Sequence, residues 1–97
     1  MLLFLTALAG NSFAGETNLV DAASAKVGHS LFLKNCAHCH GTDAGGDEGP
    51  DLHNLDWTDE QIATRIRNGK KGQMTAFGGK LSPQQISEVI AYLRTLK

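Results

Sequence analysis

The 97-residue sequence predicts a small all-α domain. Three segments carry apolar residues at helical spacing, and no alternating apolar–polar run is long enough to indicate a strand. Two glycine-rich segments, residues 41–56 and 69–80, separate the predicted helices. Loops of this length are uncommon in so small a domain, so we expect them to wrap around a bound group.

The first two helices are expected over residues 22–35 and from Thr58 to about Gly69. The first helix is indicated by pairs of residues four positions apart, a spacing that places both members on one helix face. In the second, Thr58 and Gln61 have the spacing of a capping box, and a glycine after Asn68 is a common helix end. The paired positions of the first helix are Val27/Leu31 and Gly28/Phe32.

The third helix has the clearest start. Ser82 and Gln85 form a second capping box around Pro83, a residue favoured at the first helical position. The apolar residues that follow recur at helical spacing and predict one buried stripe. This stripe comprises Ile86, Val89, Ile90, Leu93 and Leu96.

Residues 1–14 are expected to be a signal peptide, which leaves one domain over residues 15–97. The apolar stretch Leu2–Ala9 is too short to span a bilayer, for which about 20 residues are needed. Residues 12–14 (Ser-Phe-Ala) have the small-x-small pattern of a cleavage site. Because no Lys or Arg precedes the apolar stretch, an uncleaved membrane anchor is the alternative.

The formal net charge of −1 argues against a nucleic-acid-binding protein, which would normally be strongly basic. The charges are unevenly distributed along the chain. Residues 41–60 contain seven acids and no Lys or Arg, whereas residues 61–80 contain five bases and no acid. Such asymmetry can steer a charged partner, although two solvated faces would give the same pattern.

The motif Cys36-Ala37-His38-Cys39-His40 has the spacing that covalent attachment of a c-type haem requires. The two thiols add to the vinyl groups at one porphyrin edge, and His40 is then directed at the iron. Three weaker alternatives are a zinc site with a fourth ligand from another histidine, a thioredoxin-like redox pair and a disulfide. The spacing of a zinc site and a βαβ pattern are both missing, and a disulfide would close only a tiny loop. The other histidines are His29, His38 and His53, of which the first and last are expected at the surface.

An electron-carrying haem iron also needs a sixth ligand, and a neutral thioether stabilises its ferrous state. Met74 is the only methionine after Met1, and it lies in the second glycine-rich segment, away from any helix stripe. We therefore expect Met74 to be the second axial ligand.

Five segments carry a wider pattern: Gly28-x-x-Leu31-Phe32, Cys36-Ala37-His38-Cys39-His40-Gly41, Gly49-Pro50-Asp51-Leu52, Asn68–Phe77 and Ile90-Ala91-Tyr92-Leu93. In this order they resemble the class I cytochromes c, which carry one haem with His/Met ligation, over residues 25–97. The resemblance implies a small cytochrome c fold whose helices wrap around the covalent haem, with His40 and Met74 as axial ligands. It also implies that the Pro50 carbonyl accepts a hydrogen bond from the His40 ring.

The same resemblance implies that Gly28 lets the first and last helices cross closely, with Phe32 and Tyr92 packed at the crossing. Thr75 stands where the family usually has proline, which leaves the methionine loop with a freer backbone. The Trp57 side chain could reach a haem propionate, although a capping or core role fits its position equally well.

These features predict an electron carrier with one covalent haem c and its iron, exported to the periplasm or an equivalent compartment. No nucleophile–base pair or carboxylate dyad is present, so no catalytic residues are expected. The expected partners are redox proteins such as membrane respiratory or photosynthetic complexes, docking at Lys70 and Lys71. No nucleic acid and no small-molecule substrate is expected, and the chain is expected to be a monomer.

Two other functions remain open at this point. The chain could be the haem module or a subunit of a larger oxidoreductase or terminal oxidase, or, as a weaker option, a ligand-sensing haem domain in which Met74 does not bind.

Overall fold

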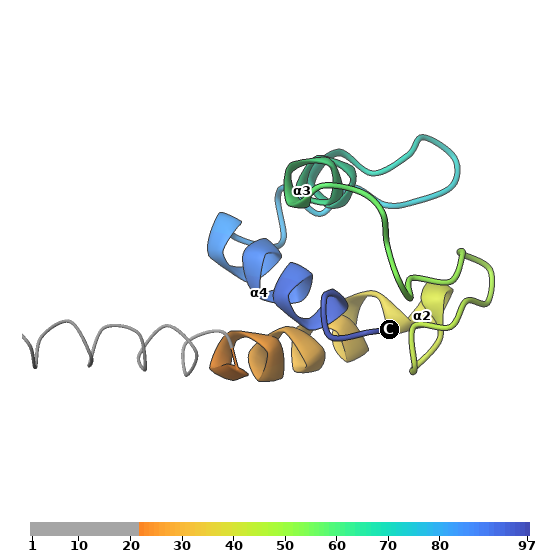
Figure 1. Cartoon of the computed structure of the whole chain (residues 1–97). Coiled ribbons are helices and arrows are strands. Elements are labelled where there is room, and N and C mark those ends of the chain that lie inside the picture. The colour runs from red at the N-terminus through yellow and green to blue at the C-terminus, as the bar shows by residue number, and fades with distance from the viewer. Residues whose placement is uncertain (1–21) are drawn as a thin grey trace, which may run out of the picture.

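The computed structural model describes residues 22–97, and the predicted signal peptide (residues 1–14) lies outside the described residues (Figure 1). The described chain is all-helical, as predicted. A first helix over residues 22–35 is followed by α2 (Ala37–His40), α3 (Asp59–Asn68) and α4 (Pro83–Leu93). Among these residues the only β-type pairing is an isolated bridge between Lys70 and Met74.

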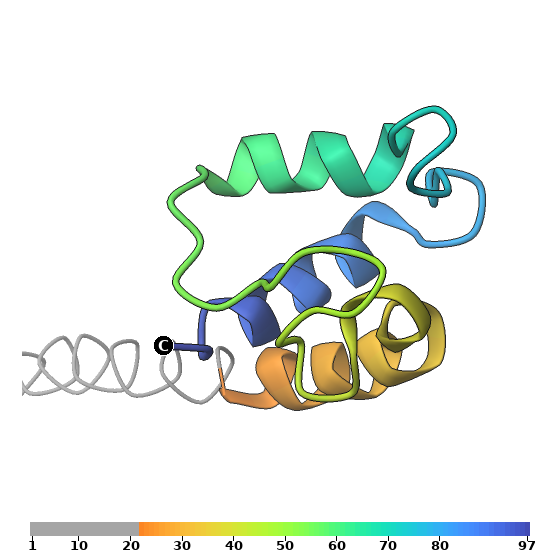
Figure 2. The same cartoon turned by 90° about the vertical axis from the view of Figure 1, so that its right-hand side faces the viewer.

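The first helix and α4 lie against each other in both views (Figures 1 and 2). A Cβ atom at Gly28 would overlap the backbone carbonyl of Glu88, so only glycine permits this approach of the two helices. Beside it, the rings of Phe32 and Tyr92 lie with their centroids 5.3 Å apart, and both side chains are buried. The close crossing that the family resemblance implied is present.

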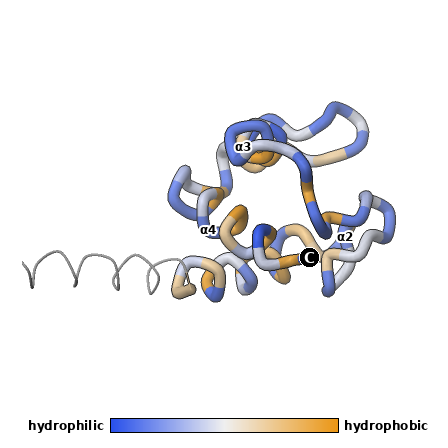
Figure 3. Tube along the Cα trace, viewed as in Figure 1, coloured by the Kyte–Doolittle hydropathy of each residue, from blue (hydrophilic) through white to orange (hydrophobic). Residues whose placement is uncertain are grey.

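The second long helix, α3, begins and ends where the sequence predicts. The Thr58 hydroxyl accepts from the Gln61 amide at 3.1 Å, and the Gln61 side chain accepts from the Thr58 amide at 2.9 Å. Ile62 and Ile66 form its buried face, which packs on α4. Figure 3 shows that α3 and α4 both alternate between hydrophilic and hydrophobic stretches, as expected for helices with one buried face.

The helix α4 starts as predicted but ends three residues earlier than the last residue of its apolar stripe. Ser82 and Gln85 form the expected capping box, with Pro83 in the first turn. At the other end, the Thr95 amide and hydroxyl both bond to the Tyr92 carbonyl, at 2.9 and 2.6 Å, which tightens the chain into a turn. Leu96 therefore lies beyond the helix, although it still packs against the core.

Arg94, at the C-terminal cap of α4, joins this helix to the segment that precedes α3. Its guanidinium donates to the carbonyl of Leu55 at 3.0 Å and to the carbonyl of Trp57. It also forms an ion pair with Asp59 at 2.7 Å, in the first turn of α3. Within residues 22–97, no helix combines the length and apolar character needed to cross a membrane.

Candidate functional site

The two cysteines and His40 lie within one helical turn. The amides of Cys39 and His40 both bond to the Cys36 carbonyl, at 3.2 and 3.0 Å. Residues three and four positions apart share one face of a helix, so this turn places two sulfurs and one imidazole on the same side. Both thiols are free and half-buried, and burial together with the charge of Cys39 raises the pKa of Cys36 to about 11.

The orientation of the His40 ring is set by a backbone carbonyl. Its Nδ1 lies 2.9 Å from the carbonyl oxygen of Pro50. A carbonyl can only accept, so Nδ1 is the protonated nitrogen and donates this bond. In the neutral imidazole Nε2 then keeps its lone pair, which is the state that a metal-ligating histidine needs.

The loop after α2 forms a close cradle for this ring. A Cβ atom at Gly49 would lie 2.8 Å from Cε1 and 3.0 Å from Nδ1 of His40, so the ring rests directly on the glycine backbone. The loop is fixed to the end of α2, because the amides of Gly46 and Gly49 bond to the carbonyls of His40 and Cys39, at 2.8 and 2.6 Å.

Met74 lies on the loop between α3 and α4. It is half-buried and packs against the hydrophobic core. A tight turn holds its backbone, since the Lys70 amide bonds to the Met74 carbonyl at 2.8 Å and the Met74 amide to the Lys70 carbonyl at 2.7 Å. The Phe77 amide also bonds to the Ile66 carbonyl at 2.9 Å, which ties the loop to the end of α3.

The structure thus brings Cys36, Cys39, His40 and Pro50 into one group around α2. Met74 is on a separate element: the loop between α3 and α4 lies above α2 in both views (Figures 1 and 2). The exposed side chains of Lys70 and Lys71 are on that same loop. Binding of Met74 to the same centre as His40 stays a prediction.

The donor set of the α2 group fits a covalently bound haem. Two thiols three residues apart can form the two thioethers at one porphyrin edge, and His40 already has the tautomer and ring support of an axial ligand. Met74 offers a soft, neutral donor from an element other than α2, as coordination from the second face would require.

The zinc alternative finds no support among residues 22–97, where no three His, Cys, Asp or Glu side chains gather as a metal site. His29 is exposed and stacks on Tyr92, with ring centroids 4.6 Å apart. His53, expected at the surface, is only 30% exposed and bonds through Nδ1 to the Asp51 carboxylate at 2.7 Å. The hydrogen bonds from His53, above all from its amide, lower the pKa of Asp51.

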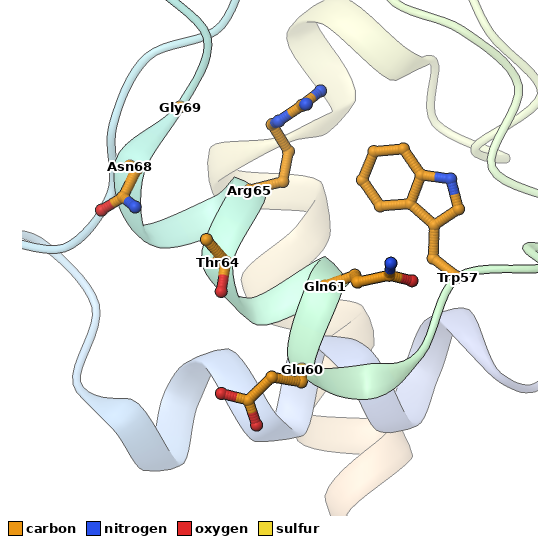
Figure 4. Close-up of a pocket in the computed structure, with 7 residues that line it drawn as sticks. All are labelled: Trp57, Glu60, Gln61, Thr64, Arg65, Asn68 and Gly69. Atoms are coloured by element: carbon orange, nitrogen blue, oxygen red, sulfur yellow. The ribbon is translucent and has the colours of Figure 1, made fainter.

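A cavity of about 480 Å³ lies along the outer face of α3 (Figure 4). The side chains of Trp57 and Arg65 extend on the same side of the helix, with the guanidinium carbon 5.1 Å from the indole centroid. Sequence reasoning missed this cation–π pair, because the two residues are eight positions apart and belong to no shared motif. It also missed the contact of Gly49 with His40, for which the only signal was a glycine directly before Pro50.

Comparison with solved structures supports the fold. Cytochrome cL from Hyphomicrobium denitrificans superposes with a TM-score of 0.71 at 29% identity, covering 76% of this chain and 48% of that one. The KustC0563 c-type cytochrome superposes with a TM-score of 0.66 at 26% identity, covering 72% of this chain and 96% of that one. The described chain therefore has the fold of c-type cytochromes.

Sequence comparison is more specific. Residues 23–93 match the family model described as cytochrome c oxidase, cbb3-type, subunit III. The subunit FixP of Bradyrhizobium sp. strain ORS 278 is 39% identical over 110 residues, covering 95% of this chain and 38% of FixP. The subunit CcoP of Rubrivivax gelatinosus is 34% identical over 82 residues, covering 78% of this chain and 27% of CcoP.

The chain belongs to the cytochrome c family, as a domain of the cbb3-type subunit III kind. Its general role is accordingly electron transfer, and the Cys36/Cys39 pair implies covalent haem c. The chain spans well under half the length of the two oxidase subunits that it matches.

Proposed function

We propose that this chain carries single electrons by means of one haem c, attached through Cys36 and Cys39 and ligated by His40 and Met74. The observation that carries the proposal is the α2 turn, in which two thiols and a histidine share one side and the Pro50 carbonyl holds the histidine ring. When bound, the haem supplies a ferric/ferrous couple.

The residues of the chain have distinct roles in this proposal. The cysteines fix the porphyrin edge, so that the cofactor cannot dissociate. The Pro50 carbonyl increases the electron donation of His40 through its hydrogen bond and so favours the ferric state. Met74 opposes this effect, because a neutral thioether favours the ferrous state and raises the potential.

Covalent attachment is tested by extracting the denatured protein with acidic acetone. The haem should remain on the polypeptide, and replacing both cysteines with Ala should leave little folded haem protein, because a core of this size depends on its cofactor. Complete extraction of the haem, or isolation of the protein with zinc, would contradict the proposal.

Ligation by Met74 is tested separately. The ferric protein should have the weak far-red band of a sulfur–iron bond, and Met74→Ala should abolish the band, lower the potential and open the iron to carbon monoxide. A band that persists in Met74→Ala would exclude Met74. Carbon monoxide binding to the native ferrous protein would instead favour a ligand-sensing domain.

A second candidate is an electron-transferring domain or subunit within a larger oxidase. It is favoured by the match to subunit III over residues 23–93 and by the FixP and CcoP relatives, which are named as oxidase subunits. Co-purification with a terminal oxidase from native membranes would support this arrangement over a freely diffusing carrier.

Export and docking complete the proposal. Haem attachment outside the cytoplasm requires export, with residues 1–14 as the signal; mass spectrometry of the native protein should find Gly15 at the N-terminus. Lys70 and Lys71 would dock a redox partner that carries an acidic patch, such as a membrane complex.

A further inference from the structure

Two loops of opposite charge extend from the two ligand-bearing elements. We name residues 41–51 the acidic loop; it begins directly after His40 and contains no Lys or Arg. We name residues 69–80 the basic loop; it contains Met74 and no acid. The exposed charged residues are Asp43, Asp47, Glu48 and Asp51 in the acidic loop, and Lys70, Lys71 and Lys80 in the basic loop.

Most of these charges have no opposite charge to neutralise them within the described residues. There the ion pairs are Arg94–Asp59, outside both loops, and His53–Asp51, which engages one acid of the acidic loop. Asp47 and Glu48 are exposed in the acidic loop, as Lys70 and Lys71 are in the basic loop. Their charges are therefore available to a partner.

Both loops lie on the same side of the molecule. In Figure 2 this side faces the viewer, with the acidic loop crossing the front and the basic loop at the upper right. If His40 and Met74 bind one iron from opposite faces, as proposed above, the acidic loop belongs to one haem face and the basic loop to the other. The proposed haem would then lie between loops of opposite charge.

We infer that the partner which fits this bipolar side is a second copy of the chain, in a transient encounter. A twofold axis through the side makes the contact reciprocal, so that the acidic loop of each copy meets the basic loop of the other. The formal net charge is only −1, so overall repulsion between copies is weak and the local charges dominate. The inference rests on the proposed function, because the haem gives the encounter its redox consequence.

The encounter allows one electron to pass from the ferrous centre of one copy to the ferric centre of the other. No bond forms or breaks and no proton moves, so the products are the same two species with their roles exchanged. Copies of the chain can therefore pass electrons to one another through the same side that would meet an acidic partner.

The test is the electron self-exchange rate, measured by NMR line broadening in mixtures of ferric and ferrous protein. Screening lengths fall from about 30 Å at 0.01 M salt to about 3 Å at 1 M. We expect the rate to fall about tenfold over that range, at the low end of the effects known for charge steering. If repulsion between two net-negative molecules controlled the encounter, the self-exchange rate would instead rise as salt is added.

Charge reversal sharpens the test. Lys70→Glu/Lys71→Glu places acid against acid at both contacts of a pair, and Asp47→Lys/Glu48→Lys places base against base. Each variant alone should exchange about tenfold more slowly than wild type at low salt. A mixture of labelled ferric Lys70→Glu/Lys71→Glu with unlabelled ferrous Asp47→Lys/Glu48→Lys restores both attractive contacts, and its exchange should return to the wild-type rate.

The matched control is Lys26→Glu/Lys34→Glu, which changes net charge equally with exposed lysines of the first helix. It should exchange faster than Lys70→Glu/Lys71→Glu, because it has the same net charge but keeps the charges of both loops. A wild-type rate that does not fall with salt, or a mixture no faster than either variant alone, would overturn the second-copy contact. These results would leave the proposed function intact as long as the haem is covalent and the far-red band is present. Absence of that band from the wild-type protein would contradict the ligation and, with it, the inference.

Discussion

The His40 ring is held by two contacts of different kinds, and their combined effect can be tested at one neighbouring residue. The Pro50 carbonyl fixes Nδ1 by a hydrogen bond of 2.9 Å, and the backbone of Gly49 supports the ring from beside it. Because Pro50 contributes only a backbone atom, no side-chain substitution removes its bond directly. Gly49 is therefore the position at which a substitution can disturb the His40 ring.

Gly49→Ala would place a methyl group 2.8 Å from Cε1 of His40 and push the ring away from Pro50. With a weaker hydrogen bond, His40 donates less electron density to the iron. This destabilises the ferric state, so the reduction potential of the haem should rise. Overpacking should also lower the free energy of unfolding by about 1–3 kcal/mol. A redox titration and urea denaturation of the haem protein measure the two effects.

Gly79→Ala is the matched control, because no atom lies within 4 Å of its added methyl group. It should leave the potential unchanged. If Gly49→Ala lowers stability without moving the potential, Gly49 serves loop packing only and has no effect on ligation.

At the scale of helices, the sequence was informative where the determining contacts are local. The capping boxes at Thr58 and Ser82 each span three residues, and both helix starts were predicted correctly from them. The apolar stripe predicted for this helix continues to Leu96, three residues beyond the end of α4, because the bonds from Thr95 to the Tyr92 carbonyl end the helical pattern before Leu96.

Contacts between distant segments were beyond the sequence pattern alone. The close contact between the first helix and α4 at Gly28 could be predicted only from the family resemblance, because it depends on where α4 lies. The bonds of Arg94 to residues 35–39 positions earlier leave no periodic signal at all. For the site, the Cys36/Cys39/His40 group was predicted from spacing, whereas its support by Gly49 depends on how the loop folds back.

The crossing of the first helix and α4 predicts a pH dependence. Tyr92 is the only tyrosine, it is 8% exposed, and burial followed by the charge of Asp43 raises its pKa above the usual value of about 10. The folded protein thus holds this proton more tightly than the unfolded chain does. The stabilisation is complete below the unfolded pKa and is lost as pH rises toward the folded one.

Ultraviolet titration of tyrosinate in the haem protein should therefore give a midpoint above that of a free tyrosine. Asp43→Asn should lower the midpoint only partly, since burial remains and the stacked His29 ring is unchanged. Tyr92→Phe should keep the crossing and make stability less sensitive to pH above about 10. A midpoint at the ordinary value would mean that the phenol is solvated in the folded protein.

At the scale of the whole molecule, three chain segments meet at Arg94. The end of α4, the segment before α3 and the first turn of α3 are joined by its guanidinium, which bonds to Leu55, Trp57 and Asp59. Two of these partners are backbone carbonyls, so the contact determines the path of the loop that connects the acidic loop to α3. Close by, the Asn54 amide bonds to the Leu96 carbonyl at 3.1 Å and reinforces the same junction.

Arg94→Lys tests whether this junction holds the molecule together. Lysine keeps the charge but lacks the planar fork that reaches two carbonyls and a carboxylate together. The substitution should lower the free energy of unfolding by about 1–3 kcal/mol, as expected when hydrogen bonds to a charged group are lost. Asp59→Asn, which removes only a solvent-exposed ion pair, should cost less than about 1 kcal/mol.

Urea denaturation of the haem protein measures both losses, and Arg67→Lys is the control. Arg67 is exposed and makes only a long side-chain bond of 3.4 Å to Thr64, so its replacement should stay within about 0.5 kcal/mol of wild type. Emission from Trp57, the only tryptophan, should rise at lower urea in Arg94→Lys, because the loop that carries it separates first from α4. If Asp59→Asn is as costly as Arg94→Lys, the ion pair rather than the bonds to the carbonyls maintains the junction.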